Sequence, residues 1–474
     1  MEVPPNHLKG EISLFIQYSM DQLCLPMDLE VDISSNHVAR VVNDFINRLD
    51  DRLFTEAYSG GGRDSYHPKM LTKVIVYALT QRIYSSRQIA KAVRENIPFM
   101  WLAGRQRPDF RTINRFRSER MKEQLEQIFA GLLELLVQEG YVKLDHYFVD
   151  GTKIEANANR YTFVWKKAVV KHQAKLEEKV KQLFMEMDEW NRQEDQEHGG
   201  KDLEELGEDA ELTIAKLEVA AQQLEAKLKA EPKNKVVKKA VRKLRKDLLP
   251  RLQKYESQLE LMGERNSLSK TDTDATFMRM KEDHMRNGQL KPGYNVQIGT
   301  ENQFIVGYSL HQRPTDTRCL IPHLEKVKKM LGRLPKTIIA DAGYGGEENY
   351  AYLEKENLEA FVKYNSFYKE TSKAWQNDPS KLENWTYNGE TDSWVCPQGR
   401  TLHFVRERKS KTGSGYEVKL RIYRSNSCEG CPIRDRCSKA ERDREIGVSI
   451  EYLRYKQLAG QKLRSEEGRA LTAK

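Results

Sequence analysis

The stretch HYFVDGTKIEANANRYTFVWKK, residues 146–167, decides the fold of this chain. Its apolar start, YFV, predicts a strand within residues 141–156, and Asp150 and Gly151 follow that start at once. Polar and basic residues come next, with aromatic residues among them. We therefore expect Asp150 to stand at the end of a strand that enters the core, and such a carboxylate needs a partner.

A second aspartate has the same setting. The string TIIAD, residues 337–341, is another apolar strand that ends in a carboxylate, and small residues follow Asp341. Two strands of one sheet would bring Asp150 and Asp341 together. Without a cation the two charges would repel each other, whereas Mg²⁺ prefers carboxylate oxygens with water or phosphate as its other ligands. The alternative for each aspartate alone is a turn or cap residue.

The composition favours a polyanionic partner. The chain has 474 residues, of which 31% are charged, and its formal net charge is +9. Such a surplus favours nucleic acid, although many ordinary proteins share it. No apolar run approaches the roughly 20 residues that span a bilayer, and the first residues do not resemble a secretion signal. We expect no membrane partner and a cytoplasmic protein.

The pattern of residues predicts an α/β protein of several parts. The expected parts are a helical DNA-binding domain at 1–140, a first core strand with its flank at 141–164, a helical, coiled-coil-like insertion at 165–263, the rest of the core at 264–384, a Cys-rich β insertion at 385–440 and a helical end at 441–474. Within 165–263, apolar residues at helical spacing on both sides of Pro232 predict a helical hairpin. This hairpin could stay within one chain, mediate dimerisation or reach along DNA.

Several basic residues are candidates for DNA contacts. Three short helices in the first part resemble a helix-turn-helix arrangement, and the last of them exposes Arg111, Asn114, Arg115 and Arg117 near its start. The alternative for these four is a solvated helix face. The residues that follow the first core strand and could steady a phosphate are Arg160, Lys166 and Lys167.

Four late cysteines have spacing that suits a metal. They lie in VCPQGR and SNSCEGCPIRDRC, and they are Cys396, Cys428, Cys431 and Cys437. Four thiolates are a common ligand set for structural Zn²⁺. The alternative is a cluster of reduced thiols without a metal.

Together these strings resemble the DDE-type transposases of bacterial insertion sequences. The resemblance rests on YHPKMLTKVIVYALTQRIYSSRQIAKAVREN, RPDFRTINRFR, FVDGTKIEANANRYTFVWKK, SKTDTDATFMRM, KPGYNVQIGT and IIADAGYGGEENY, and on the cysteine cluster. It implies an RNase H-like mixed sheet with catalytic, metal-binding Asp150 on the first core strand and Asp341 on the fourth. It also implies Mg²⁺ or Mn²⁺, cleavage and strand transfer at the terminal inverted repeats and in target DNA, a homodimer and a place at the nucleoid.

The third acid of the family remains to be found. The family has a glutamate on a helix that follows a segment like LRSEEGRALTAK, so we expect it beyond residue 474 and expect activity impaired by truncation. Candidate substitutes within the chain are Glu445, Glu451, Glu466 and Glu467, but a solvated, charged terminal segment is the favoured interpretation of all four. Minor candidates near the metal are Asp272, Asp274, His311 and Asp316, for which ordinary turn residues are the favoured alternative. The alternative function is an inactive protein that binds the DNA ends as a repressor or inhibitor.

Overall fold

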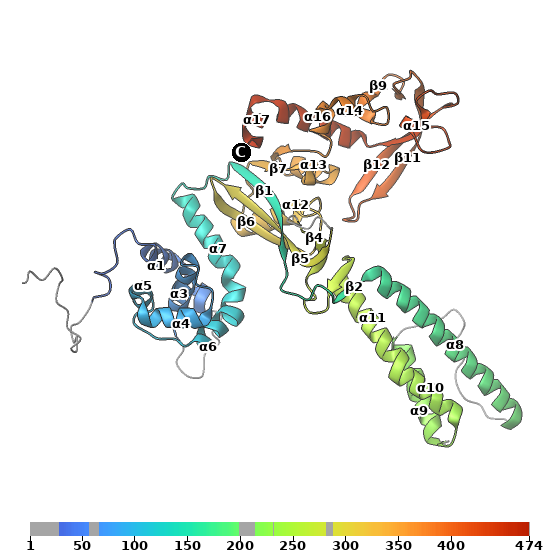
Figure 1. The fold of residues 1–474 in the computed structure, drawn as a ribbon, viewed down its shortest axis with the longest axis horizontal. Coiled ribbons are helices and arrows are strands. Elements are labelled where there is room, and N and C mark those ends of the chain that lie inside the picture. Colours follow the sequence, from blue (N-terminus) through green and yellow to red (C-terminus); the bar gives the residue numbers. More distant parts are fainter. Residues whose placement is uncertain (1–27, 56–65, 199–213, 231, 281–287, 474) are drawn as a thin grey trace, which may run out of the picture. The chain divides into compact units, whose positions relative to one another are not determined.

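The residues described by the computed structural model are 28–55, 66–198, 214–230, 232–280 and 288–473 (Figure 1). The chain divides into two units, Met1–Leu136 and Val137–Lys474, which are taken in turn below. Among the described residues no helix is both long enough and apolar enough to cross a bilayer.

The first unit is helical. Its helices are α1 (Val38–Arg48), α2 (Arg52–Thr55), α3 (Pro68–Thr80), α4 (Ser86–Glu95), α5 (Ile97–Leu102), α6 (Phe110–Arg115) and α7 (Met121–Gln138), and α7 continues into the second unit. A π-helical turn, Phe116–Arg120, joins α6 to α7. One apolar face of each longer helix meets a shared core that includes Ile46, Val74 and Ile113, as amphipathic spacing requires. Asp109 caps α6 by accepting a hydrogen bond of 2.8 Å from the Thr112 N–H.

The second unit is built on a mixed sheet of six strands. Its strands are β1 (His146–Glu155), β4 (Thr276–Arg279), β5 (Leu290–Glu301), β6 (Phe304–His311), β7 (Thr337–Ala340) and β8 (Glu359–Val362). The path is β4-β5-β1-β7-β8, and β6 also pairs with β5. β1 is antiparallel to β5 and parallel to β7, and β7 is parallel to β8. The expected mixed α/β sheet is confirmed, but the extra edge strand β4 makes β7 the fifth strand of this sheet in chain order rather than the fourth.

The expectation that Asp150 stands at the end of its strand was wrong. Asp150 lies inside β1 and pairs with Ile298 of β5, and the pairing continues to Glu155 opposite Gly293. Of the two strands that pair with β1, only the parallel strand β7 ends before Asp150, with its last residue Ala340 beside Val149. The start of β1 is fixed by Glu301, which is 4% exposed and accepts hydrogen bonds from the Leu144 and Asp145 N–H groups at 2.7 and 3.0 Å.

A buried tyrosine of β1 packs across β5 and β6. Tyr147 is fully buried, and its hydroxyl lies 2.8 Å from Nε2 of His323 on α12 (Leu320–Leu331). Burial lowers the pKa of His323 to about 3, so the imidazole is neutral at physiological pH. The phenol ring fills the space over Gly299 and Gly307, which face each other on β5 and β6. This packing holds β1 flat against the next two strands.

A helical arm, drawn in green in Figure 1, lies between β1 and β4 in the chain. We define it as α8 (Lys166–His198), α9 (Ile214–Ala230), α10 (Lys235–Lys243), a π-helical turn at Leu244–Leu248 and α11 (Leu249–Met262). Leu176, Leu224, Leu244 and Leu252 belong to its own core. At its base the short strands β2 (Phe163–Trp165) and β3 (Ser267–Ser269) pair with each other.

The remaining elements form a second sheet and cover the first. The second sheet has the order β13-β12-β11-β10-β9, with β9 (Thr386–Asn388), β10 (Ser393–Val395), β11 (Thr401–Lys411), β12 (Glu417–Ser425) and β13 (Glu445–Val448). The remaining helices are α13 (Glu347–Lys355), α14 (Lys373–Gln376), α15 (Arg434–Cys437), α16 (Ile450–Arg464) and α17 (Glu466–Thr472). Leu463 of α16 and Leu471 of α17 pack on Ile339 and Phe361 of the first sheet.

Candidate active site

Three polar residues follow a single row of paired strand residues. In that row Val149 of β1 lies beside Ala340 of β7, and Ala340 lies beside Val362 of β8. The next residues along the three strands are Asp150, Asp341 and Lys363. Because neighbouring strands lie about 4.8 Å apart, this register puts the two carboxylates within reach of one shared ion.

All three side chains line one open pocket of about 370 Å³. Its other lining residues are Phe148, Val149, Thr152, Ile298, Thr300, Ile339, Ala340, Leu471 and Thr472. Lys363 was not singled out from the sequence. Its signal was the same as that of the two aspartates, since it is the first polar residue after the buried pair Phe361 and Val362.

Asp341 is held in place by the turn that it begins. Its Oδ1 accepts a hydrogen bond of 2.8 Å from the Gly343 N–H, and the Thr317 hydroxyl donates to the Gly343 carbonyl at 2.9 Å. The Asn349 side-chain amide donates to the carbonyls of Thr317 and Tyr344, both at 2.8 Å. The turn is thus tied to α13 and to the loop before α12, so the carboxylate is oriented before any ligand arrives.

Asp316 lies against the backbone that carries Asp150. Its Oδ1 accepts hydrogen bonds from the buried amides of Asn295 and Gln297 at 2.7 and 3.0 Å. A Cβ on Gly151 would lie 2.5 Å from that same oxygen, so only glycine fits after Asp150. Burial raises the pKa of Tyr344, and the charges of Asp316, Asp341 and Asp150 raise it further. All three carboxylates therefore influence the pKa of the Tyr344 hydroxyl, which donates a hydrogen bond to Gln297.

None of the four minor candidates, Asp316 included, lines this pocket. Asp272 accepts a hydrogen bond from the Tyr294 hydroxyl at 2.9 Å, and Asp274 accepts one from Gln312 at 3.3 Å. His311 lies 2.7 Å from the Ser309 hydroxyl. Burial lowers the pKa of His311.

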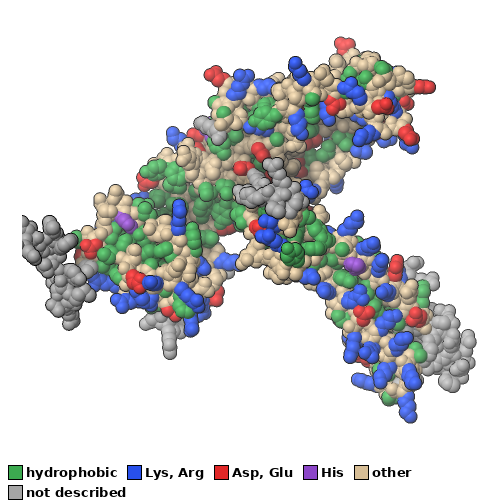
Figure 2. Space-filling model, in the orientation of Figure 1, with side chains coloured by type: hydrophobic (Ala, Val, Ile, Leu, Met, Phe, Trp, Pro, Cys, Tyr) green, Lys and Arg blue, Asp and Glu red, His purple; other side chains and the backbone are tan. Residues whose placement is uncertain are grey.

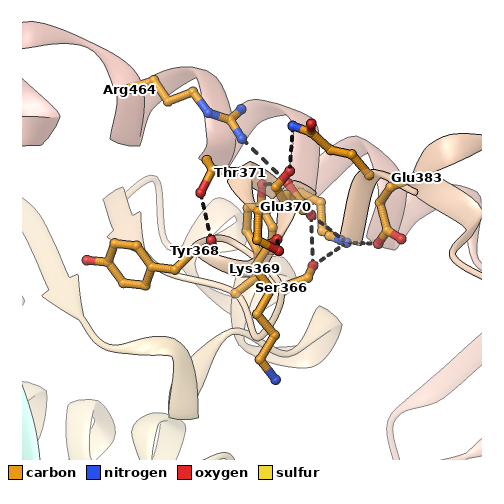
Figure 3. A network of polar contacts seen from close by, with 11 residues as sticks. Ser366, Tyr368, Lys369, Glu370, Thr371, Glu383 and Arg464 are labelled. Atoms are coloured by element: carbon orange, nitrogen blue, oxygen red, sulfur yellow. Dashed lines mark hydrogen bonds and ion pairs between the residues drawn. The ribbon is translucent and has the colours of Figure 1, made fainter. Parts of the chain in front are cut away.

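A polar network fixes α16, which leads into the pocket-lining helix α17. Lys456 of α16 is only 12% exposed and contacts Ser366, Glu383 and Glu370 at 3.0, 2.6 and 3.4 Å. Figure 3 shows Glu370 between Ser366 and Arg464, and its Oε1 accepts from the Ser366 hydroxyl at 2.8 Å. The loop after β8, which starts at the pocket with Lys363, is thereby clamped to α16.

The four glutamates near the end of the chain do not line the pocket. Glu445 pairs with Arg424, and Glu451 pairs with Arg454 at 3.2 Å. Glu466 and Glu467 lie exposed in the first turn of α17. Among the described residues, no group of three or more His, Cys, Asp and Glu side chains is arranged so that it could hold a metal ion.

The four late cysteines line a second, small pocket of about 20 Å³ beside the second sheet. Cys396 and Cys437 pack against Trp385 and Trp394. Burial raises the pKa of the Cys437 thiol, and the other three cysteines raise it further. The four cysteines thus line one pocket, although within the described residues their geometry is not that of a metal-binding group.

The basic candidates of the first unit are all exposed, but two of them have partners. Arg117 donates to the Tyr84 carbonyl at 2.8 Å, and Arg115 pairs with Glu119 at 3.1 Å. Arg111 lies over the Phe110 ring, and Asn114 faces solvent on the same helix. These side chains form one polar surface on α6 and the turn after it.

The basic candidates after β1 do not reach the carboxylate pocket. Arg160 pairs with Glu155 at 2.8 Å, and Lys166 donates to the Gly263 carbonyl at 2.5 Å. Lys167 is exposed at the start of α8. None of the three lines the pocket, because β1 extends past Asp150 before the chain turns.

Three parts of the chain match known protein families. Residues 27–119 match a family described as a transposase domain, DUF772. Residues 265–425 and 395–474 each match a family described as a transposase DDE domain. No curated protein and no solved structure matches the chain. The matches cover most of the helical unit, strands β4 to β8 of the first sheet together with Asp341, and the end of the chain, while β1 with Asp150 lies outside them. Such a DDE domain implies an RNase H-like core. The chain therefore belongs to the DDE-type transposases of insertion sequences.

Proposed function

We propose that this transposase cleaves DNA at the ends of its insertion sequence and joins those ends to target DNA with a divalent metal. The observation that supports this proposal is the register that sets Asp150 beside Asp341 at one pocket. The family matches favour the transposase over the alternative of an inactive repressor. Work on chromosomal DNA implies a cytoplasmic, nucleoid-associated protein, and an element with two ends suits a homodimer.

The carboxylates of Asp150 and Asp341 suit Mg²⁺ or Mn²⁺. Both supply hard oxygen donors, and the open pocket leaves room for water and phosphate oxygens to complete the coordination. Bound there, the cation would activate a water or a 3′-hydroxyl and stabilise the leaving oxygen. Asp341 keeps its orientation through the Gly343 N–H, and Asp316 supports Asp150 through the backbone of Gly151.

Lys363 supplies a positive charge to the same pocket. Lys363 comes next to Asp341 in the row of strands. Its ammonium group, which lies 5.1 Å from the centre of the Tyr368 ring, can bind a non-bridging oxygen of the scissile phosphate. With no phosphate bound, it offsets part of the repulsion between the two carboxylates. Lys363 therefore holds the DNA backbone while the aspartates hold the cation.

The first unit supplies the proposed contacts with the terminal repeats. Arg111 and Asn114 are exposed on α6 and suit phosphates or base edges. Arg115 and Arg117 reach DNA only by leaving Glu119 and the Tyr84 carbonyl. The proposed contacts with DNA away from the scissile phosphate come from Arg160, Lys166 and Lys167. Substituting Arg111 and Asn114 with Ala should weaken binding to the element's ends, and unchanged affinity would contradict this assignment.

Metal removal is the direct test of the proposed reaction. The 474-residue chain is incubated with a duplex that carries both ends of the element, and nicked and joined strands are resolved on a denaturing gel. We expect products with Mg²⁺ or Mn²⁺ and none with EDTA, because the two carboxylates alone supply no Lewis acid. Products in EDTA, or no product with either metal, would contradict the proposal.

We also propose that Cys396, Cys428, Cys431 and Cys437 bind one structural Zn²⁺. Four thiols line one pocket of about 20 Å³, which is enough for one ion-sized guest. We expect about one zinc per chain by elemental analysis, and Cys431→Ser should lower both the zinc content and the melting temperature, since structural zinc stabilises the fold. Cys319→Ser, which changes a buried thiol of α12's cap, should leave the zinc content unchanged. A metal-free purified chain that folds equally well would exclude the site.

A further inference from the structure

We infer that the helical arm binds double-stranded DNA through one basic face of α10, and this inference rests on the proposed function in taking DNA as the partner. Seven of the twelve residues from 235 to 246 are Lys or Arg, and none is acidic. Six of them are exposed and form what we call the α10 stripe: Lys235, Lys238, Lys239, Arg242, Lys243 and Lys246.

The stripe is continuous because of its helical spacing. At about 100° per residue, the six positions fall within an arc of roughly 140°. The opposite side of the same helix carries Val237, Ala240, Leu244 and Leu248, which are buried in the core of the arm. The seventh basic residue, Arg245, lies between the two faces and pairs with Glu225 of α9 at 2.8 Å. The stripe is thus the solvent face of a helix whose apolar face is already covered.

The six stripe residues have no protein partner among the residues that the structure describes. None of them takes part in the ion pairs or side-chain hydrogen bonds of those parts of the chain. The nearest acidic residue along the helix is Asp247, which pairs with Arg251 at 3.2 Å. In Figure 2, Lys and Arg side chains gather over the part of the arm that α9 and α10 form. Six like charges without counter-charges repel one another, and a polyanion relieves that repulsion.

The length of the stripe suits a nucleic-acid backbone. From Lys235 to Lys246 the helix rises roughly 16 Å, which equals about five base pairs of duplex. Asn234 caps the helix by accepting from the Val236 and Val237 N–H groups at 3.1 and 3.2 Å, so the stripe begins on ordered backbone. An acidic membrane is the poorer partner, since a membrane-binding helix inserts its apolar face, and that face of α10 is buried. The phosphates of a duplex require only the charged face.

The test compares two fourfold variants of the 474-residue chain that lose the same charge from the same arm. The stripe variant is K238Q/K239Q/R242Q/K246Q. Its control is K171Q/K175Q/K179Q/K181Q on α8, where the exposed lysines flank Glu177 and Glu178. Gln is a good helix former, and circular dichroism checks that both variants keep their helix content. Affinity for a 40-base-pair duplex of random sequence is measured by fluorescence anisotropy at several NaCl concentrations.

We expect the stripe variant to bind at least tenfold more weakly at low salt than the wild type. Its plot of log affinity against log salt should be shallower by about three to four, because each lost phosphate contact removes about 0.9 from the slope. The control should stay within threefold of the wild type. An equal loss in both variants, or no loss in the stripe variant, would overturn the inference and leave the proposed function standing.

Two further outcomes are informative. A wild-type chain that does not bind the duplex at low salt would overturn both this inference and the DNA partner of the proposed function. Competitors are duplex RNA and vesicles that contain phosphatidylserine. If either displaces the labelled duplex from the wild type more effectively than unlabelled DNA does at equal charge, and the stripe variant loses that advantage, the α10 stripe serves that partner and the assignment to DNA fails.

Discussion

Replacing Asp150 with Ala is expected to lower metal-dependent DNA cleavage by about a thousandfold or more. Asp150 and Asp341 are the two carboxylates that line the pocket. Removing one halves the protein's anionic ligands and weakens the binding of the cation that stabilises charge on the phosphate. Such stabilisation is worth several kcal/mol, and each 1.36 kcal/mol changes the rate about tenfold. The measurement is the initial rate of nicking on a duplex with the element's ends.

Two further variants separate the metal site from the fold. Asp341→Asn removes the charge and keeps an oxygen that can accept from the Gly343 N–H, so the turn should persist while cleavage is lost. Asp145→Ala, at the entry to β1, removes a carboxylate whose partner is Lys336 at 2.8 Å. This control should cleave at the wild-type rate. Calorimetric titration with Mn²⁺ should show binding to the wild type and to Asp145→Ala but not to Asp150→Ala. An Asp150→Ala enzyme within threefold of the wild-type rate would refute the metal assignment.

The sequence predicted the two carboxylates because the signal is local. An apolar strand segment followed by an aspartate occurs at both Asp150 and Asp341, and parallel neighbours in one sheet bring such residues together. The position of Asp150 within its strand could not be predicted from the local sequence. β1 continues past Asp150 because β5 pairs with it as far as Glu155, and that pairing partner lies more than a hundred residues later in the chain.

The places of Asp316 and Lys363 near the two aspartates could not be predicted from the sequence. Asp316 follows no strand directly, and it resembles the turn residues Asp272 and Asp274 in its local string. Only the tertiary structure brings it against Gly151 and the amides of Asn295 and Gln297. Lys363 had the same local signal as the aspartates, but a lysine after a strand is common at a surface. Its place in the row depends on β8 pairing with β7.

The basic residues after β1 do not line the pocket for a related reason. Nearness in sequence to Asp150 suggested that Arg160, Lys166 and Lys167 would share its site. A strand advances about 3.3 Å per residue, so the five residues from Asp150 to Glu155 carry the chain well away from the pocket. The structure uses Arg160 and Lys166 in contacts with Glu155 and Gly263 instead.

Gly299→Ala is expected to destabilise the first sheet by about 3 kcal/mol or more. A Cβ at Gly299 would lie far closer to Cζ and Oη of Tyr147 than the 3.0 Å that real Cβ atoms respect. Tyr147 is fully buried and cannot move aside without leaving His323. Overpacking of this kind typically costs about 1–3 kcal/mol and occasionally more, and here a ring rather than a flexible side chain resists. The measurement is the protection of β1 and β5 amides against hydrogen exchange, which reports on this sheet separately from the helical unit.

A matched glycine and a double variant test that reason. Gly389→Ala adds the same methyl group where its nearest neighbour would be Tyr387 Cε1 at 4.0 Å, so it should change stability by less than about 0.5 kcal/mol. If the clash with Tyr147 is the cause, Gly299→Ala should cost much less in a Tyr147→Ala background. The coupling between the two changes should then exceed about 1 kcal/mol. Additive effects would mean that the methyl group is resisted by something other than the phenol ring.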